Sequence, residues 1–357
     1  MRIALFSDTY YPIPDGVSKH LVDFKKELKR RGHQVRVYTL VKGDGDVYNL
    51  PSIPFPLYKE YRMGLPNFDI YKDLDKFAPD IIHVHTPFVL GTIGHYYHTR
   101  MNIPIIGTYH TDFVNMDNTI KFPFIKSLLN LGFMYNMYLY KKFDMIVSPS
   151  EPIARMLRKY NVDSKVIHVG IDLSNFKYNE EKDDYFLFLG RLTFDKGITH
   201  FLEAASQMPD ERFVVAGVGP LVTEVKKYVA KYKNIEYLGY VDEGTKLELL
   251  SKAKLLILPS RAETFGIVYV EAMASGTPVI ASNESREIGI LKEGVNGWLV
   301  KFGCPSCIVE KVKQIKSMDL KEISRNALKS SMEFGIESTV EKILDAYGGL
   351  IELHKNS

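Results

Sequence analysis

Short apolar runs alternate with amphipathic stretches along the first 170 residues of the chain. Each run has the length of a buried strand, whereas residues 15–34 carry apolar side chains at helical spacing and reach a stop signal at Gly32. A second helical stretch, residues 71–79, precedes another apolar run. We therefore expect strands at residues 2–8, 34–40, 80–87, 103–110, 145–150 and 165–170.

The same alternation restarts after a turn-rich, charged segment at residues 172–184. Strands that alternate with helices indicate βαβ units and parallel sheets. The chain is thus predicted to be α/β, with two Rossmann-like domains, residues 1–171 and 172–335, that face each other across a cleft. In the second half we expect helices at residues 198–208 and 264–275, and strands at residues 185–191, 212–220, 234–241, 255–260 and 278–282.

A carboxylate stands in the body of the helix expected at residues 264–275. Apolar residues surround Glu271 on nearly every side, Thr264 is a suitable N-cap, and Gly276 is a stop signal. A buried carboxylate without partners costs on the order of several kcal/mol, so Glu271 must meet hydrogen-bond donors. A ligand with hydroxyl groups would supply them, and a structural pairing with an arginine is the alternative.

A second carboxylate and two cations follow expected strands. Glu263 follows one strand, and Arg191 and Lys196 follow another; ligands gather at the carboxyl ends of strands in open α/β sheets. A helix N-terminus that begins near Gly266 is a ready anion site, and two cations five residues apart suit a diphosphate. The alternatives are an exposed Glu263 and surface pairing of the cations with Asp195.

Other candidate residues give weaker signals. Gly16 opens the first helix and could approach a phosphate, and His110 ends a strand from which it would project into the cleft. The AGVGP segment at residues 216–220 contains GxG but lacks the third glycine, which argues against a nicotinamide site.

Two patterns that could bind a metal are incomplete. His83 and His85 share one face of a strand, but no third ligand is evident. Asp44-Gly45-Asp46 matches the Asp-x-Asp of metal-dependent sugar transferases, yet it lacks the usual preceding apolar strand and we discount it.

Composition and charge narrow the class of partner. Of 357 residues, 45% are hydrophobic and 25% are charged, and the net charge of +3 is too small to indicate a nucleic-acid partner. Residues 1–170 carry 22 lysines and arginines against 16 acidic residues. This basic surplus suggests an anionic partner such as a membrane surface, with a solvated basic face as the equal alternative.

The cysteines and the hydropathy pattern indicate the cellular compartment in which the protein is expected. Cys304 and Cys307 allow one disulfide at most, so nothing indicates secretion, and one CxxC lacks the second pair of a zinc site. We interpret residues 303–307 as a loop rather than a thioredoxin-type helix start. The first strand leaves no room for a signal peptide and no run is long enough to span a bilayer, so we expect a cytoplasmic protein.

The segment at residues 122–142 is aromatic and apolar with basic ends. Such a helix could lie in a membrane interface, which would make the protein peripheral at the inner face of the membrane. Burial in the core is the equal alternative.

These segments together resemble glycosyltransferase family 4, retaining transferases of the GT-B fold, over nearly the whole chain. The most specific part is Glu263-x7-Glu271 in ETFGIVYVEAMASGTPVIAS, and GRLTFDKG supplies the family's Arg and Lys. AGVGP, EYLGYV and HVGIDLSNF match in type and order. Two departures are Asp15-Gly16 in place of Gly-Gly and NESRE in place of a glycine-rich turn after PVIAS.

The resemblance implies an acceptor-binding first domain, a nucleotide-sugar-binding second domain, and a last helix, residues 336–357, that crosses back onto the first. It implies a catalytic group in which Glu263 meets the transferred sugar, Arg191 and Lys196 stabilise the leaving diphosphate, and His110 lies near the sugar. No metal or other cofactor is required. The implied donor-binding residues are Gly16, Arg191, Lys196, Tyr240, Val241, Glu263, Phe265, Gly266, Ile267 and Glu271.

The implied reaction moves a hexose from a UDP- or GDP-sugar to an acceptor with retention. The VHTPFVLGTIG and TYHTDF segments look most like members that glycosylate diacylglycerol or related lipids. A soluble sugar or polysaccharide precursor is the alternative acceptor. Rival classes are a nucleotide-sugar epimerase, a non-catalytic nucleotide-sugar-binding protein and an NAD-dependent oxidoreductase.

Overall fold

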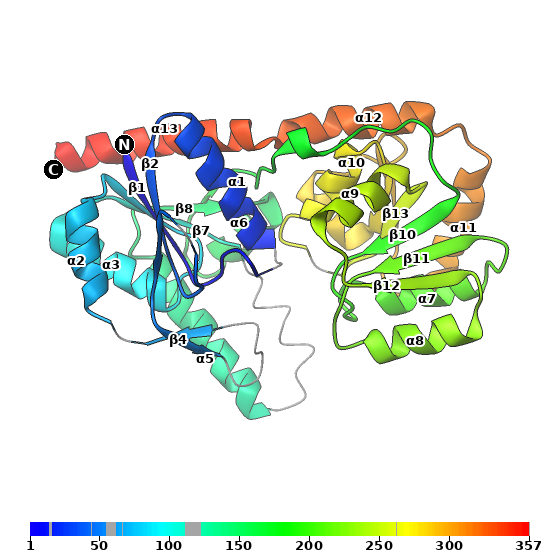
Figure 1. Ribbon diagram of the computed structural model, residues 1–357, viewed down its shortest axis with the longest axis horizontal. Coiled ribbons are helices and arrows are strands. Elements are labelled where there is room, and N and C mark those ends of the chain that lie inside the picture. The colour runs from blue at the N-terminus through cyan, green and yellow to red at the C-terminus, as the bar shows by residue number, and fades with distance from the viewer. Residues whose placement is uncertain are drawn as a thin grey trace. The chain divides into compact units, whose positions relative to one another are not determined.

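The structure is a computed structural model that describes residues 1–13, 16–43, 45–54, 62–65, 67–110, 123–261 and 263–356. The chain divides into two compact units, Met1–Asp172 with Ile336–Ser357 (unit 1) and Leu173–Gly335 (unit 2). Each unit is a parallel sheet covered by helices, so the predicted α/β class is confirmed (Figure 1).

Unit 1 is built on a sheet of seven parallel strands. Its first strand in sequence is apolar at successive positions because both faces are covered: Ile3 and Leu5 enter one core, and Ala4 and Phe6 the other. In spatial order the strands are β3 (Val47–Asn49), β2 (Gln34–Thr39), β1 (Arg2–Ser7), β6 (Ile81–Val84), β7 (Ile105–Thr108), β8 (Met145–Ser148) and β9 (Lys165–Val166); β4 (Ser52–Pro54) and β5 (Arg62–Gly64) form a separate antiparallel pair.

Helices cover both faces of this sheet. On one face α1 and α13 pack together, and α1 buries Leu21, Phe24 and Leu28, which lie at the helical spacing predicted from the sequence. Side chains of α2, α3, α5 and α6 fill the core on the other face. The helices of unit 1 are α1 (Gly16–Arg30), α2 (Asp69–Phe77), α3 (Val89–Met101), α5 (Pro123–Tyr140), α6 (Glu151–Arg158) and α13 (Ile336–Lys355).

Unit 2 has a sheet of six parallel strands, in the order β12 (Ile235–Gly239), β11 (Arg212–Ala216), β10 (Tyr185–Leu189), β13 (Leu255–Leu258), β14 (Val279–Ser282) and β15 (Gly297–Val300). Helices α7 and α8 lie on one face, and α9 and α10 lie on the other (Figure 1). Helix α11 packs against α7, and α12 packs against α10. These helices are α7 (Ile198–Ser206), α8 (Val222–Lys231), α9 (Glu243–Lys252), α10 (Ile267–Ala274), α11 (Pro305–Lys316) and α12 (Lys321–Ser331).

Strand order reverses at one place in each sheet. In unit 1 the chain moves outward from β1 to β3 and then returns to β6 on the other side of β1. In unit 2 the corresponding neighbours are β10 and β13. The loops that leave such a pair diverge, and ligands of open α/β sheets bind between them. The loops after β1, β6, β10 and β13 are therefore the candidate functional regions.

The expected start of the helix after β13 is wrong. Thr264 is not its N-cap, because α10 begins at Ile267 with Gly266 in the left-handed conformation as the N-cap. The ring of Tyr269 packs so closely on Gly266 that an added Cβ would lie 2.5 Å from it. Glycine is required there for both the positive φ angle and the close contact.

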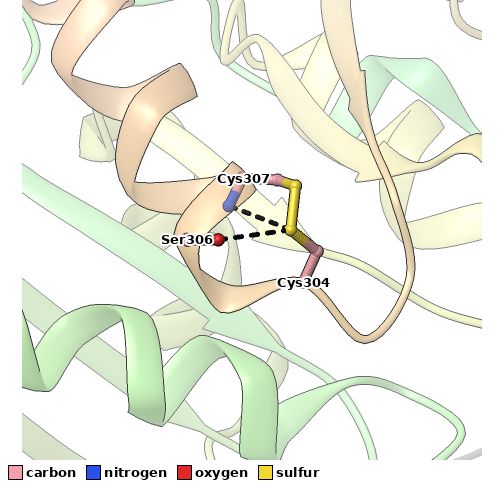
Figure 2. The surroundings of a disulfide bond; sticks show 3 residues. All are labelled: Cys304, Ser306 and Cys307. Carbon is pink, nitrogen blue, oxygen red and sulfur yellow. Dashed lines mark hydrogen bonds between the residues drawn. A yellow bond between two sulfur atoms is a disulfide. The ribbon is translucent and has the colours of Figure 1, made fainter.

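The interpretation of the CxxC segment as a loop is also wrong. Helix α11 begins at Pro305, Cys304 is its N-cap, and Cys304 forms a disulfide with Cys307 (Figure 2). Proline at the first helical position has its φ angle preset for the helix and lacks only an N–H that would have no helical partner. This local signal outweighs the preceding strand-like context.

Candidate active site

The reversal point of unit 2 brings two predicted residues into contact. Lys196 lies in the loop after β10 and Glu263 in the loop after β13, and Lys196 Nζ is 2.6 Å from Glu263 Oε1. Their side chains are 25% and 10% exposed, so the alternative of an exposed Glu263 is wrong. Lys196 pairs across the two loops, and the structure assigns it no ion pair with its neighbour Asp195. A cation and a carboxylate therefore stand together where ligands of such sheets bind.

The GxG of residues 216–220 has a structural explanation. A Cβ on Gly217 would collide with the carbonyl oxygen of Gly190, and one on Gly219 would lie 2.6 Å from the carbonyl oxygen of Leu192. Backbone bonds join the two loops, with Leu192 N–H donating to Val218 O at 2.9 Å. The glycines let this loop lie directly against the loop that carries Arg191, whose side chain is exposed.

Glu271 is buried in α10, and its partner belongs to the protein itself. Lys246 on α9 places its Nζ 2.8 Å from Glu271 Oε1 and 2.9 Å from the carboxylate of Glu243. The alternative predicted from the sequence was that Glu271 pairs with an arginine, but its partner is a lysine. Sequence reasoning missed Lys246 because no helix was assigned to residues 243–252. The carboxylate is thus paired and fixed in place before any ligand arrives.

The start of α10 is anchored to the sheet. Tyr269 is buried, and its hydroxyl donates to the carbonyl oxygen of Leu258 at 3.0 Å. Phe265 is also buried, and its ring packs on Phe334 with centroids 5.6 Å apart. The first amides of a helix have no partner within it, so the backbone at Gly266 and Ile267 is suited to an anion.

Tyr240 and Val241 directly follow β12, two strands away from β10 in the sheet. The ring of Tyr240 is exposed, and Gly217 N–H donates to Gly239 O at 2.7 Å, which joins the ends of β11 and β12. Because all strands of this sheet are parallel, their carboxyl ends lie along the same edge as Lys196 and Glu263. The role expected for Tyr240 and Val241 in donor binding stays a prediction.

In unit 1, His110 lies beside a buried group of histidines. His110 Nε2 is 2.9 Å from His85 Nδ1, and one nitrogen each of His20, His85 and His110 lie within 4.8 Å of one another. These three have the ligand number of a metal site, whereas the sequence had offered only two. The direct bond between His85 and His110 engages one nitrogen of each ring, and the expectation that no metal is required stays a prediction.

The fourth member, His83, is fully engaged by the protein. Its Nδ1 lies 2.6 Å from the hydroxyl of Tyr347 on α13, and its Nε2 lies 2.7 Å from the hydroxyl of Thr108. His20 Nδ1 bonds to the carbonyl oxygen of Gly170 at 2.9 Å. Hydrogen bonds of the histidine cluster (His20, His83, His85 and His110) thus connect α1 to Gly170, and connect β6 with its following residues to β7 and α13.

Burial keeps this cluster uncharged at neutral pH. Loss of hydration lowers the pKa of His20 to about 4 and that of His83 to about 3, and it lowers the pKa of His85 and His110 well below the ordinary value. His110 is therefore available as a neutral imidazole, which can donate one hydrogen bond and accept another.

Sequence reasoning missed a carboxyl group at the reversal point of unit 1. Asp8 follows β1, and Thr86, which follows β6, donates its hydroxyl to Asp8 Oδ2 at 2.9 Å. Backbone amides of Phe88 and Leu90, at the start of α3, also bond to this carboxylate. Burial raises the pKa of Asp8 to about 7. Its place at the end of the first strand was the signal that could have identified it.

Two sequence candidates remain. Gly16 is the exposed first residue of α1. Of the Asp-x-Asp pattern, Asp44 lies outside the described residues, and Asp46 pairs with Lys29 at 2.5 Å. Its partner is thus a lysine of α1.

Comparison with known proteins shows the class of protein to which the chain belongs. Residues 14–175 match the family described as Glycosyltransferase Family 4, and residues 171–331 match Glycosyl transferases group 1. The "Alpha-monoglucosyldiacylglycerol synthase" of Streptococcus pneumoniae is 30% identical over 318 residues, covering 79% of this chain and 71% of the relative. The protein of that name from Acholeplasma laidlawii is 27% identical over 335 residues, covering 83% and 84%.

A solved structure agrees in fold. Anabaena HepE in complex with UDP-glucose matches with a TM-score of 0.76 at 17% identity, covering 98% of this chain and 100% of that chain. The fold and the matches define a glycosyltransferase of the GT-B type that uses nucleotide-sugar donors. The chain belongs to glycosyltransferase family 4, and the prediction of a hexosyltransferase is confirmed. Within the described ranges, no helix has the length and apolar character needed to cross a bilayer.

Proposed function

We propose that this enzyme transfers a hexose, with retention, from a UDP- or GDP-sugar to the hydroxyl group of a membrane lipid such as diacylglycerol or a related glycolipid. The relatives from Streptococcus pneumoniae and Acholeplasma laidlawii are named for glucosyl transfer to diacylglycerol, which supports the lipid acceptor. The Anabaena structure with bound UDP-glucose supports a uridine donor.

The observation that carries the lipid acceptor is the surface of α5. Leu131, Met134, Tyr135 and Tyr138 lie at helical spacing and are exposed, with 68%, 54% and 58% exposure for Leu131, Met134 and Tyr138. The opposite side of the helix is buried. Lys142 places its ammonium group 5.5 Å from the centre of the Tyr138 ring. An apolar stripe with aromatic rings and an adjacent cation is suited to an anionic membrane surface.

The proposed chemistry uses the Lys196–Glu263 pair. A diphosphate would take Lys196 from Glu263, because it offers more negative charge and more acceptor oxygens than one carboxylate. Glu263 would then be released to bind a hydroxyl of the transferred sugar. As the bond to the sugar breaks, charge grows on the diphosphate, and Lys196, Arg191 and the start of α10 would stabilise it. This donor set calls for no metal or other cofactor.

Binding of the donor is tested first by calorimetric titration with UDP, GDP and ADP in the presence of EDTA. We expect one nucleotide to bind without a metal. We propose that Glu271 accepts a hydrogen bond from a ribose hydroxyl of the nucleotide. Glu271→Ala should therefore weaken that binding about 10–100-fold, because a charged hydrogen bond is lost. Affinity for inorganic pyrophosphate should stay unchanged in the same variant. Equal losses for nucleotide and pyrophosphate would mean that Glu271 acts only through its ion pair with Lys246.

The membrane surface is tested by co-sedimentation with anionic and zwitterionic vesicles. The double variant Leu131→Ser/Tyr138→Ser should lower affinity for anionic vesicles about tenfold or more, because two apolar side chains no longer enter the interface. Phe68→Ser is the matched control, since Phe68 is 78% exposed but lies at the start of α2. Equal binding by all three proteins, with transfer independent of vesicles, would favour the soluble acceptor.

A further inference from the structure

The CPSC segment has the architecture of a redox-active dithiol. It follows β15 after a three-residue connection, and Cys304 and Cys307 occupy the N-cap and first turn of α11 (Figure 2). Both cysteines are only partly buried, so a small thiol can reach them. The disulfide closes a loop of four residues, and a loop this short constrains the unfolded chain least, so stabilisation of the fold is a weak explanation for it.

The surroundings of Cys304 favour the reduced state. The backbone N–H of Cys307 donates to Cys304 Sγ at 3.2 Å, and the hydroxyl of Ser306 lies 3.4 Å from the same sulfur (Figure 2). After reduction, both donors and the N-terminus of the twelve-residue helix α11 would stabilise a thiolate at Cys304. A disulfide whose reduced form is stabilised in this way is readily reduced.

A chain of aromatic contacts connects this segment to the loop between β10 and α7. The ring of Phe302, two residues before Cys304, lies 4.9 Å from the ring of His200 on α7 and 5.9 Å from the ring of Phe194. The rings of Phe194 and His200 are 5.5 Å apart. Phe194 belongs to the loop that presents Lys196 to Glu263. A change in the backbone conformation at Cys304 would therefore be transmitted through these ring contacts to the loop proposed to bind the donor diphosphate.

We propose that Cys304 and Cys307 form a reversible dithiol–disulfide site that controls the conformation of residues 191–197 through Phe302. In reduction, the thiolate of a cellular dithiol or of glutathione forms a bond to one sulfur and expels the other as a thiolate. A second thiol of the reductant then displaces the remaining sulfur. The protein gains two electrons and two protons, and the reductant leaves as its disulfide. The effect on donor affinity rests on the function proposed above.

The redox site is tested on the full chain in buffers of varied reduced-to-oxidised glutathione ratio. Free thiols are counted by alkylation and mass spectrometry, and the fluorescence of the single tryptophan, Trp298 on β15, is followed in parallel. Both readouts should change with one two-electron midpoint within the buffering range of glutathione. Cys304→Ser/Cys307→Ser should show no change. A pair that stays oxidised, or stays reduced, in every mixture would overturn the proposal.

The proposed effect of the disulfide on residues 191–197 is tested by a separate measurement. Hydrogen exchange of residues 191–197 should differ between oxidised and reduced protein, and UDP affinity should differ about fivefold or more. Phe302→Leu should keep the redox midpoint but lose the difference in exchange. If the two states exchange alike, the connection through Phe302 is wrong. If exchange differs but UDP binds to neither state, the proposed donor site has failed and the redox proposal stands.

Discussion

Replacement of Glu263 with glutamine is expected to lower hexosyl transfer about 10²–10³-fold while UDP still binds. The substitution keeps the size of the side chain but removes its charge, so a contact that strengthens as the sugar becomes cationic is lost. Lys196 loses the negative charge that lies 2.6 Å away and becomes more available to the diphosphate, so nucleotide affinity should hold or improve. Initial rates of transfer and calorimetry with UDP would separate the two effects.

The matched control is Glu248→Gln on α9. Glu248 pairs with Lys252 at 2.7 Å, and both side chains are exposed. This variant removes the same kind of ion pair away from the reversal point, and exposed pairs contribute little to stability. It should transfer hexose at the unchanged rate. A Glu263→Gln enzyme of normal activity would show that the Lys196–Glu263 pair serves only to hold two loops together.

The fold was predictable because its signals are local. Apolar runs of strand length and the spacing of Leu21, Phe24 and Leu28 each depend on neighbouring residues, and both are buried as predicted. Local signals failed at the start of α10, where the packing of a neighbouring side chain, rather than a capping hydrogen bond, decides where the helix begins. Thr264 is an acceptable N-cap by itself, but the ring of Tyr269 places the helix start at Gly266.

The site was predictable only in part, because its contacts join residues that lie far apart in the sequence. The strand ends identified Lys196 and Glu263 separately, and their contact follows from the adjacency of β10 and β13. The partner of Glu271 could not be read from the sequence, because Lys246 reaches it from another helix. Asp8 and Thr86 are 78 residues apart and meet only because β1 pairs with β6.

Ionisable side chains are buried differently in the two units. Unit 2 pairs the carboxylates of Glu263 and Glu271 with lysines, whereas unit 1 buries the histidine cluster without charge. Two carboxyl groups in the described part of unit 1, those of Asp23 and Asp8, have a pKa raised by burial, which acts in the opposite direction. Asp8 has the larger shift. Its pKa is raised from 3.8 to about 7, so its contribution to stability is present below pH 3.8 and is lost as the pH rises through 7.

Unit 1 is expected to lose stability as the pH falls from 6.5 toward 4. Each histidine of the cluster has a folded pKa below its unfolded value of 6.5, so the unfolded chain binds more protons in that range and its population grows. A shift from 6.5 to about 4 for His20 corresponds to on the order of 3 kcal/mol. Four such groups outweigh the opposing effects of Asp8 and Asp23.

Thermal unfolding across this pH range would measure the effect. Circular dichroism reports both units, whereas fluorescence of the single tryptophan, Trp298, reports unit 2. The acid-sensitive transition should therefore appear by circular dichroism before fluorescence changes. His20→Gln should make the loss with pH shallower, because a titrating group is removed. Asp8→Asn should make it steeper, because an opposing group is removed. Parallel pH profiles in wild type and both variants would show that these buried groups do not set the acid sensitivity.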